Sequence, residues 1–234
     1  MSDTFMTREY LIQSAIDRIK ARTYLEIGVH RGKNFFRISA PFQIAVDPNF
    51  IIGIKRRLNN PRVLLRSRFF EMTSDQFFAT RAASVFKDRQ LDVAFIDGLH
   101  TSEQVLADFN NCLKYLSPNG VILFHDCNPT SREAAEYGHS PREIMQKFEG
   151  KNAEWTGDVW KAIVHIRSQN KSVAAFVLDC DYGIGVARRG KPANELSLTA
   201  EQVAALTYDD LDRNRVRLLD LKPPQYWDEF IKTL

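Results

Sequence analysis

Apolar residues occur along this chain in short runs that alternate with stretches of helical spacing. Runs of strand length lie at 24–29, 43–46, 62–65, 91–96 and 121–125, each bounded by Gly, Pro, Asn or Asp. Residues 33–39, 51–58, 74–86 and 102–116 between them have the spacing of helices. This alternation predicts an α/β fold, a Rossmann-like doubly wound sheet of parallel strands with helices on both faces.

The two ends of the chain extend this pattern. Apolar residues at helical spacing predict an N-terminal helix that ends near Arg22, and 173–178 with 183–187 predicts an antiparallel pair that closes the sheet. We expect one domain over residues 1–195, with a polar insertion at 127–156 that lies over the active face and holds a short helix around 144–148. Residues 196–234 predict a helical extension that packs on the domain or on a partner subunit, through which the protein would form a homo-oligomer.

Composition removes several classes of protein. The 44% hydrophobic and 26% charged fractions of the 234 residues are ordinary for a globular protein, and no apolar run approaches the roughly 20 residues of a membrane span. A net charge of +3 with only short basic clusters does not suggest nucleic acid as a partner. Three widely spaced cysteines and the lack of a signal peptide's apolar centre predict reduced thiols and a cytoplasmic location.

The end of the first predicted strand carries an acidic residue and two glycines. Glu26 precedes Gly28 and Gly32, whose spacing lets the backbone bend and brings a helix N-terminus close to a ligand. A carboxylate there would repel a dinucleotide pyrophosphate and attract a ligand that carries an ammonium and a sulfonium group. The third glycine of a dinucleotide-binding loop is also missing, which disfavours a nicotinamide-dependent oxidoreductase.

The next two strand ends are also polar. Asp47 lies 21 positions after Glu26, where an acidic residue can accept hydrogen bonds from a ribose diol. The alternative for Asp47 is a turn carboxylate in Asp47-Pro48-Asn49, favoured by Asx geometry. Ser74 starts a predicted helix at the place where an adenine edge would meet backbone groups, although Thr73 or Ser74 would serve equally as a helix N-cap.

Carboxylates and imidazoles follow the fourth and fifth predicted strands. Asp97, Asp126 and Asn128 form an oxygen set suited to Mg²⁺, while Asp97 alternatively orients the acceptor or the amino end of the cofactor. His100 is the candidate to remove a proton from a hydroxyl group, or else a helix-start histidine bonded to backbone. Strand alternation predicts that His125 packs at the strand end and points away from Asp126.

The segments Tyr-Leu-Glu-Ile-Gly-Val-His-Arg-Gly, Ala-Val-Asp-Pro, Ile-Asp-Gly-Leu-His and His-Asp-Cys-Asn-Pro resemble class I S-adenosylmethionine (SAM)-dependent methyltransferases. They are most similar to the small O-methyltransferase-like branch, over residues 24–187. The resemblance implies a seven-stranded sheet with an antiparallel last strand in a three-layer αβα arrangement. It also implies that Glu26, Gly28 and Gly32 line the methionine end of SAM, that Asp47 holds the ribose and that Ser74 lies near adenine.

Together these features predict O-methylation of a hydroxyl group on a small molecule such as a sugar, a phenol or a natural product. The predicted catalytic residues are His100 and Asp97, and Asp97 also belongs to the cofactor set. Cys127 stands where catechol-type enzymes have the asparagine ligand of Mg²⁺, with Asn128 one place later. The alternatives are a non-catalytic SAM-binding module and an NAD-dependent oxidoreductase, because one sheet hosts many chemistries.

Overall fold

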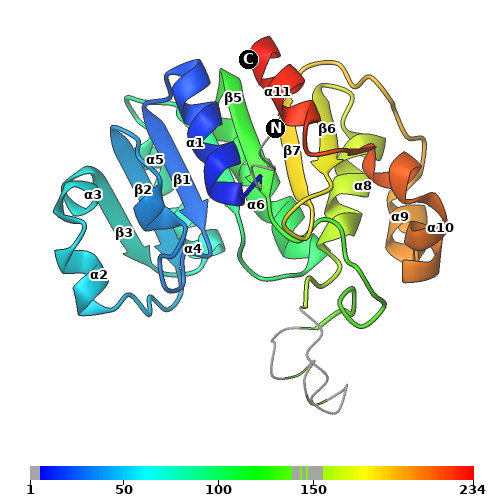
Figure 1. The fold of residues 1–234 in the computed structure, drawn as a ribbon, viewed down its shortest axis with the longest axis horizontal. Coiled ribbons are helices and arrows are strands. Elements are labelled where there is room, and N and C mark those ends of the chain that lie inside the picture. Colours follow the sequence, from blue (N-terminus) through cyan, green and yellow to red (C-terminus); the bar gives the residue numbers. More distant parts are fainter. Residues whose placement is uncertain (1–5, 139–142, 144–145, 147–154) are drawn as a thin grey trace. The chain divides into compact units, whose positions relative to one another are not determined.

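A computed structural model describes residues 6–138, 143, 146 and 155–234 (Figure 1). Its contacts divide the chain into two compact units. The first comprises residues 1–98, 107–123 and 227–234, and the second comprises residues 99–106 and 124–226. The short helix expected around 144–148 lies outside the described residues, apart from Gln146.

The first unit carries five strands in the order β3-β2-β1-β4-β5. These strands are β1 (Thr23–Ile27), β2 (Phe42–Asp47), β3 (Ser67–Glu71), β4 (Leu91–Ile96) and β5 (Leu116–Phe124). Strand β1 pairs in parallel with β2 and β4, and β2 pairs in parallel with β3. The helices of this unit are α1 (Arg8–Ile19), η1 (Phe35–Arg37), α2 (Ile54–Leu58), α3 (Pro61–Arg66), α4 (Ser74–Thr80), α5 (Ala82–Val85), α11 (Tyr226–Phe230) and η2 (Ile231–Thr233).

The second unit carries strands β7 (Ile184–Arg189), β6 (Val173–Leu178) and β8 (Leu221–Lys222), in that order. Strands β6 and β7 form the expected antiparallel pair, and β8 adds to β6 in parallel. Helices α8 (Val159–Gln169), α9 (Ala200–Ala205) and α10 (Tyr208–Leu219) pack beside them, while α6 (Ser102–Tyr115) begins in this unit and ends in the first. The mixed α/β sheet is confirmed, with eight described strands instead of seven because the C-terminal extension supplies β8.

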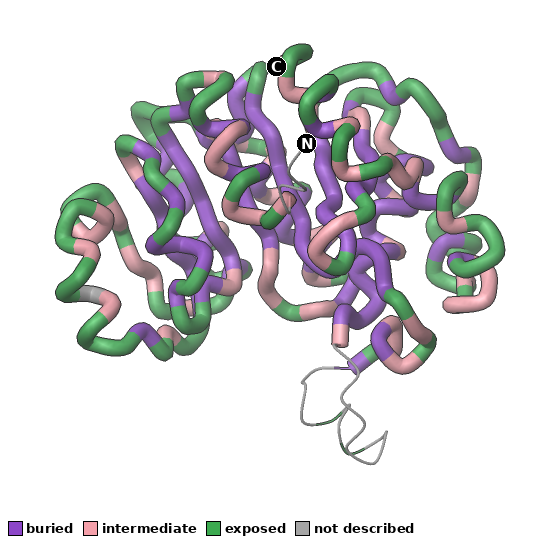
Figure 2. Tube along the Cα trace, in the orientation of Figure 1, coloured by how far each residue is buried: buried purple, intermediate pink, exposed green. Residues whose placement is uncertain are grey.

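The core of the first unit lies along its central strands. Every residue of β1 is buried, as are all but the first of β2 and all but the second of β4 (Figure 2). Strands that are buried on both faces read as continuous apolar runs, which is why their positions could be predicted. Helix α1 packs on β4 through its buried face of Leu11, Ile12, Ala15 and Ile16.

The third strand was wrongly predicted at 62–65. Those residues form helix α3, and the strand β3 follows directly at Ser67–Glu71. Pro61 occupies the first turn of α3, where a proline's fixed φ angle and missing N–H favour a helix start. The Asn60-Pro61 pair therefore starts a helix, and the apolar Val63, Leu64 and Leu65 belong to that helix.

Candidate active site

The carboxyl ends of β1, β2 and β4 lie at one edge of the first unit, because these strands are parallel and in register. The backbone continues this pairing past the strand ends. Gly28 N donates to Val46 O at 2.9 Å, and Asp97 N donates to Ile27 O at 2.9 Å. The polar residues that follow these three strands are thereby held close together.

Gly28 fits this edge only because it has no side chain. Its φ angle is +87°, and a Cβ atom built there would lie 1.9 Å from the backbone oxygen of Asp97. Gly32 has φ +66°, and its Cβ would lie 2.7 Å from the ring of Phe36. The turn after β1 is therefore in close backbone contact with the end of β4 at Gly28.

Asp47 joins the turn after β1 to the turn after β2. Its Oδ2 accepts the N–H of His30 at 2.7 Å, and its Oδ1 accepts the N–H of Asn49 at 2.7 Å. The second bond is the Asx turn that the sequence offered as the alternative role. Because a carboxylate has about four lone-pair sites, Asp47 can fill this structural role and still accept two bonds from a diol.

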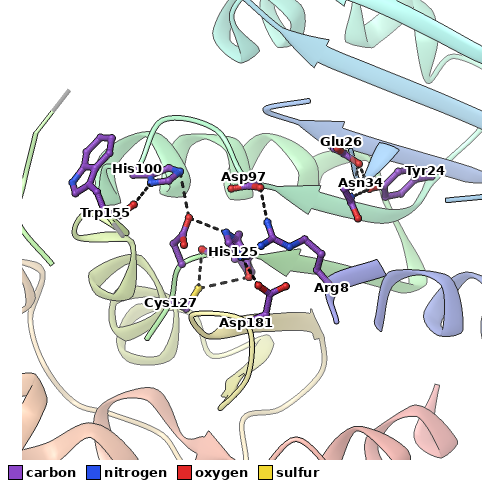
Figure 3. Close-up of polar contacts among 12 residues, drawn as sticks. Arg8, Tyr24, Glu26, Asn34, Asp97, His100, His125, Cys127, Trp155 and Asp181 are labelled. Carbon is purple, nitrogen blue, oxygen red and sulfur yellow. Dashed lines mark hydrogen bonds and ion pairs between the residues drawn. The ribbon is translucent and has the colours of Figure 1, made fainter. Parts of the chain in front are cut away.

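Glu26 lies in a buried polar cluster with Tyr24 and Asn34, two residues that were not predicted from the sequence (Figure 3). Its Oε2 accepts a hydrogen bond from Tyr24 Oη at 2.5 Å and one from Asn34 Nδ2 at 2.7 Å. Burial raises the pKa of Glu26 to about 8, against the opposing effect of these two donors. Glu26 is therefore largely protonated at neutral pH in the free protein, and a cation beside it would favour its ionised form.

Asn34 carries an unused acceptor beside Glu26. Within the described part of the chain, its Oδ1 is the one buried side-chain nitrogen or oxygen atom that has no hydrogen-bond partner. A buried unsatisfied acceptor is costly and calls for a donor that the protein itself does not supply. Asn34 could have been identified in the sequence as a polar residue between Gly32 and the buried Phe35. Tyr24 could have been identified because it precedes Glu26 by two positions and so shares its face of the strand.

Ser74 is the first residue of α4, three positions after the end of β3. Thr73, the other candidate, is the N-cap: its hydroxyl accepts from Gln76 N, and the side chain of Gln76 returns a bond to Thr73 N. This capping box leaves the hydroxyl of Ser74 outside the cap.

Asp97 follows β4 and forms an ion pair with the N-terminal helix. Arg8 at the start of α1 donates to Asp97 Oδ2 at 3.2 Å, and both side chains are about three-quarters buried (Figure 3). No local pattern in the sequence points to Arg8, because its contact with Asp97 spans 89 positions.

In the second unit His100 lies between a carbonyl and a carboxylate. Its Nδ1 is 3.0 Å from the backbone oxygen of Trp155, and its Nε2 is 3.3 Å from Asp126 Oδ2. Both partners accept hydrogen bonds, so the ring donates to both only when each nitrogen carries a proton, and a neutral ring donates to one of them. The backbone bond that the sequence offered as the alternative role is present at Nδ1, and Nε2 faces a carboxylate.

The prediction that His125 points away from Asp126 was wrong. His125 Nδ1 lies 2.9 Å from Asp126 Oδ2, and the side chains of both residues are 7% exposed. Strand β5 ends at Phe124, and Asp126 has a φ angle of +62°. A left-handed residue breaks the alternation of an extended strand, so neighbouring side chains can turn toward each other.

Asn128 is held by two hydrogen bonds within the second unit. Its Nδ2 donates to Asp179 Oδ1 at 2.9 Å, and its Oδ1 accepts from Arg215 at 2.6 Å. The amide oxygen is the atom that a metal ion would require, and the bond from Arg215 already uses one of its two lone pairs. The predicted metal ligands are divided between the units, with Asp97 in the first and Asp126 and Asn128 in the second.

Part of the chain is similar to a known protein family. A family model described as a methyltransferase domain matches residues 25–127, which include the ends of β1, β2, β4 and β5. This match agrees with the predicted resemblance to methyltransferases.

Solved structures share the fold at low sequence identity. An O-methyltransferase from Bacillus cereus in complex with SAH is 18% identical, with a TM-score of 0.51 over 80% of this chain and 82% of that one. The O-methyltransferase TomG from Streptomyces achromogenes, involved in tomaymycin synthesis and solved with SAM, is 14% identical, with a TM-score of 0.52 over 77% and 78%. An uncharacterized protein of Sinorhizobium fredii, y4gI, is 43% identical over 47 residues, which span 20% of this chain and 5% of that protein.

Proposed function

We propose that this protein transfers the methyl group of SAM to a hydroxyl oxygen of a small-molecule acceptor. The observation that supports this most is the edge formed by β1, β2 and β4 within the methyltransferase domain. There Gly28 has no room for a side chain, and two acidic residues, Asp47 and Asp97, follow the neighbouring strands. Such an edge is where ligands bind in open α/β sheets.

The residues of this edge fit the parts of SAM. Asn34 Oδ1 offers an unused buried acceptor next to Glu26, and together they would accept hydrogen bonds from the ammonium group. Asp47 would accept from the ribose hydroxyls, and Ser74 would lie near the adenine. Gly28 and Gly32 allow close approach of the backbone, and Asp97 would hold the amino end or orient the acceptor.

We assign the role of general base to His100. SAM, when bound, supplies a methyl group activated by its positive sulfur. With the Nδ1 proton bonded to the Trp155 carbonyl, Nε2 would take the proton of the acceptor hydroxyl, and Asp126, which faces Nε2, would stabilise the charged ring that results. Holding the two reactants in line at near-contact distance supplies most of the remaining rate enhancement.

His100→Ala should lower methyl transfer about 100-fold or more while the affinity for SAM stays nearly unchanged. His165→Ala, which removes a half-buried imidazole elsewhere in the second unit, is the matched control. Transfer of radiolabelled methyl to a panel of phenols and sugars measures the rate. Unchanged transfer in the His100 variant would remove this residue from the mechanism.

A role for Mg²⁺ remains part of the proposal, with Asp97, Asp126 and Asn128 as ligands. Their oxygen atoms suit a hard cation, which would lower the pKa of an acceptor hydroxyl. The Arg215 bond to Asn128 makes the fit incomplete in the free protein. A calorimetric titration with Mg²⁺ tests binding directly, and full methyl transfer in excess chelator would exclude the need for a metal.

Two other functions would use the same fold, namely a SAM-binding module without catalysis and an NAD-dependent oxidoreductase. Calorimetric titrations with SAM and with NAD separate the cofactors, and we expect heat of binding with SAM alone. Failure to bind SAM would overturn the proposal, whereas SAM binding without transfer to any acceptor would favour the non-catalytic module.

The setting of the reaction follows from coarser observations. In the described part of the chain no helix is long and apolar enough to cross a membrane. All three cysteines are free thiols, which agrees with the cytoplasmic location that we propose. We retain association into a homo-oligomer through residues 196–234 as part of the proposal.

A further inference from the structure

The turn between β6 and β7 is tight and strained. Gly183 N donates to Cys180 O at 2.8 Å, which closes a turn with Asp181 and Tyr182 at its centre. Both central residues are left-handed, with φ +48° and φ +60°. Turns of this type favour Asn-Gly or Gly-Gly, and a bulky tyrosine in the left-handed region costs free energy. Strain of this kind persists only where the surrounding structure enforces it.

The same turn is bonded to the backbone that follows β5. Cys127 N donates to Gly183 O at 2.9 Å, and Asn128 N donates to Tyr182 O at 2.8 Å. Gly183 fits so closely that a Cβ atom there would lie 2.3 Å from Asn128 N. The turn thus holds the corner that carries His125 and Asp126.

A chain of polar side-chain contacts runs from this turn to His100 (Figure 3). Asp181 Oδ1 lies 3.4 Å from His125 Nε2, and His125 Nδ1 lies 2.9 Å from Asp126 Oδ2. The same oxygen of Asp126 lies 3.3 Å from His100 Nε2. Because carboxylate oxygens only accept, both nitrogens of His125 face acceptors, and the ring donates to Asp181 and to Asp126 together when each nitrogen carries a proton.

Aromatic packing fixes the ring of His125 from another side. The Tyr182 ring meets it edge-on, with centroids 6.3 Å apart and planes at 80°. The His125 side chain is 7% exposed and that of Asp181 is 19% exposed, so little solvent competes for these contacts. A ring held by a bond at each nitrogen and by packing has one orientation.

We propose that Asp181 and His125 are positioning residues, which act through Asp126 to orient the imidazole of His100. The inference rests on the proposed function in that His100 is the base of the methyl transfer. It explains why a strained Asp-Tyr pair occupies a turn that Asn-Gly would form without strain, since Asn-Gly would lose the acidic contact and the ring. If Asp181 had only a structural role, its removal would change the surroundings of His125 and leave those of His100 unchanged.

Nitrogen-15 NMR of histidine-labelled protein at one fixed pH distinguishes these cases. The chain has five histidines, so single His→Gln replacements assign every ring signal. Asp181→Ala should shift the ring nitrogen signals of both His125 and His100, although Asp181 does not lie next to His100 in the chain of contacts. Asp181→Asn keeps an oxygen that accepts from His125 Nε2, so it should restore most of the His100 signal.

Tyr182→Phe is the matched control, because it keeps the ring and the turn and removes only a hydroxyl group; the His100 signals should stay in place. If Asp181→Ala fails to fold, His125→Leu and His125→Asn replace it. Leucine removes both donors and should shift the His100 signals, whereas asparagine keeps a donor near the position of Nδ1 and should retain them. Shifts confined to His125 in Asp181→Ala, or no shift of His100 in His125→Leu, would overturn the proposal.

This test is independent of the cofactor. It needs neither SAM nor an acceptor, so failure of the SAM titration would reject the proposed function and leave the NMR result standing. Conversely, SAM binding with an unperturbed His100 signal would reject the positioning role alone.

Discussion

At the scale of the residue, the candidate site requires glycine at a position where any side chain would clash with the backbone. Gly28 is the clearest case, because the backbone oxygen of Asp97 occupies the place of its Cβ atom. Gly53, in the same unit, has nothing within 4 Å of its Cβ position. The two glycines therefore form a matched pair for substitution.

Gly28→Ala should lower the free energy of unfolding by about 3 kcal/mol, because it adds a clash to a left-handed backbone. Gly53→Ala should change it little. Urea unfolding followed by circular dichroism measures both, and equal stability of the two variants would contradict the close approach at Gly28.

Glu26 should make stability depend on pH. Burial raises its pKa from 4.5 to about 8, so the folded protein keeps a proton that the unfolded chain releases between these values. Protons bound more tightly in the folded state make the free energy of unfolding fall as pH rises through this window. Glu26→Gln should remove that part of the decline, and Glu71→Gln, at an exposed position, should not.

Urea unfolding at several pH values between 4.5 and 8 gives the slope for each variant. A Glu26→Gln protein with the same pH dependence as the wild type would show that Glu26 is ionised in the fold. In that case its charge would face the cofactor directly, as the sequence alone suggested.

At the scale of the element, a buried arginine stabilises the C-terminal end of α10. Arg167 on α8 is 3% exposed, and its guanidinium donates to Arg217 O at 2.7 Å and Leu218 O at 2.6 Å at the end of α10, and also to Asn194 O. These carbonyls near a helix C-terminus have few other partners available, and a buried cation satisfies them.

Arg167→Ala should therefore lower the free energy of unfolding by about 3 kcal/mol, since buried carbonyls lose a charged donor. Arg132→Ala removes an exposed ion pair with Asp209 in the same unit and should have little effect. Thermal unfolding compares the two, and a small effect of Arg167→Ala would mean that water replaces its bonds.

The elements also show which parts of the secondary structure could be predicted from the sequence. Strands β4 and β6 were predicted at their observed bounds, because each is a buried apolar run between polar residues. The third strand was misplaced because Val63, Leu64 and Leu65 suit either structure, and Pro61 decides for a helix. Helices at 33–39 and 51–58 were predicted too long: the structure has η1 at Phe35–Arg37 and α2 at Ile54–Leu58.

At the scale of the whole molecule, the candidate residues fall into two sets. Glu26, Asn34 and Asp47 belong to the first unit, and His100 and Asp126 belong to the second. The first set carries the proposed cofactor contacts and the second carries the proposed base. Binding of SAM alone should therefore act chiefly on one of the two units.

Hydrogen exchange with and without SAM tests this division. Backbone amides of residues 24–34 and 45–50 should exchange more slowly when SAM is bound, because ligand binding lowers the population of open states. Residues 159–189 should change less. Protection confined to the second unit would contradict the assignment of the cofactor residues.

The sequence by itself determined the alternation of strands and helices and the acidic residues at the strand ends. These features are local, since a buried strand needs a continuous apolar run and a tight turn needs glycine. Only the tertiary structure decided that Asn34 and Tyr24 enclose Glu26, that Arg8 pairs with Asp97, and that His125 turns toward Asp126. The Arg8 contact joins segments distant in the chain, and the His125 contact depends on a left-handed residue, and neither leaves a period in the sequence.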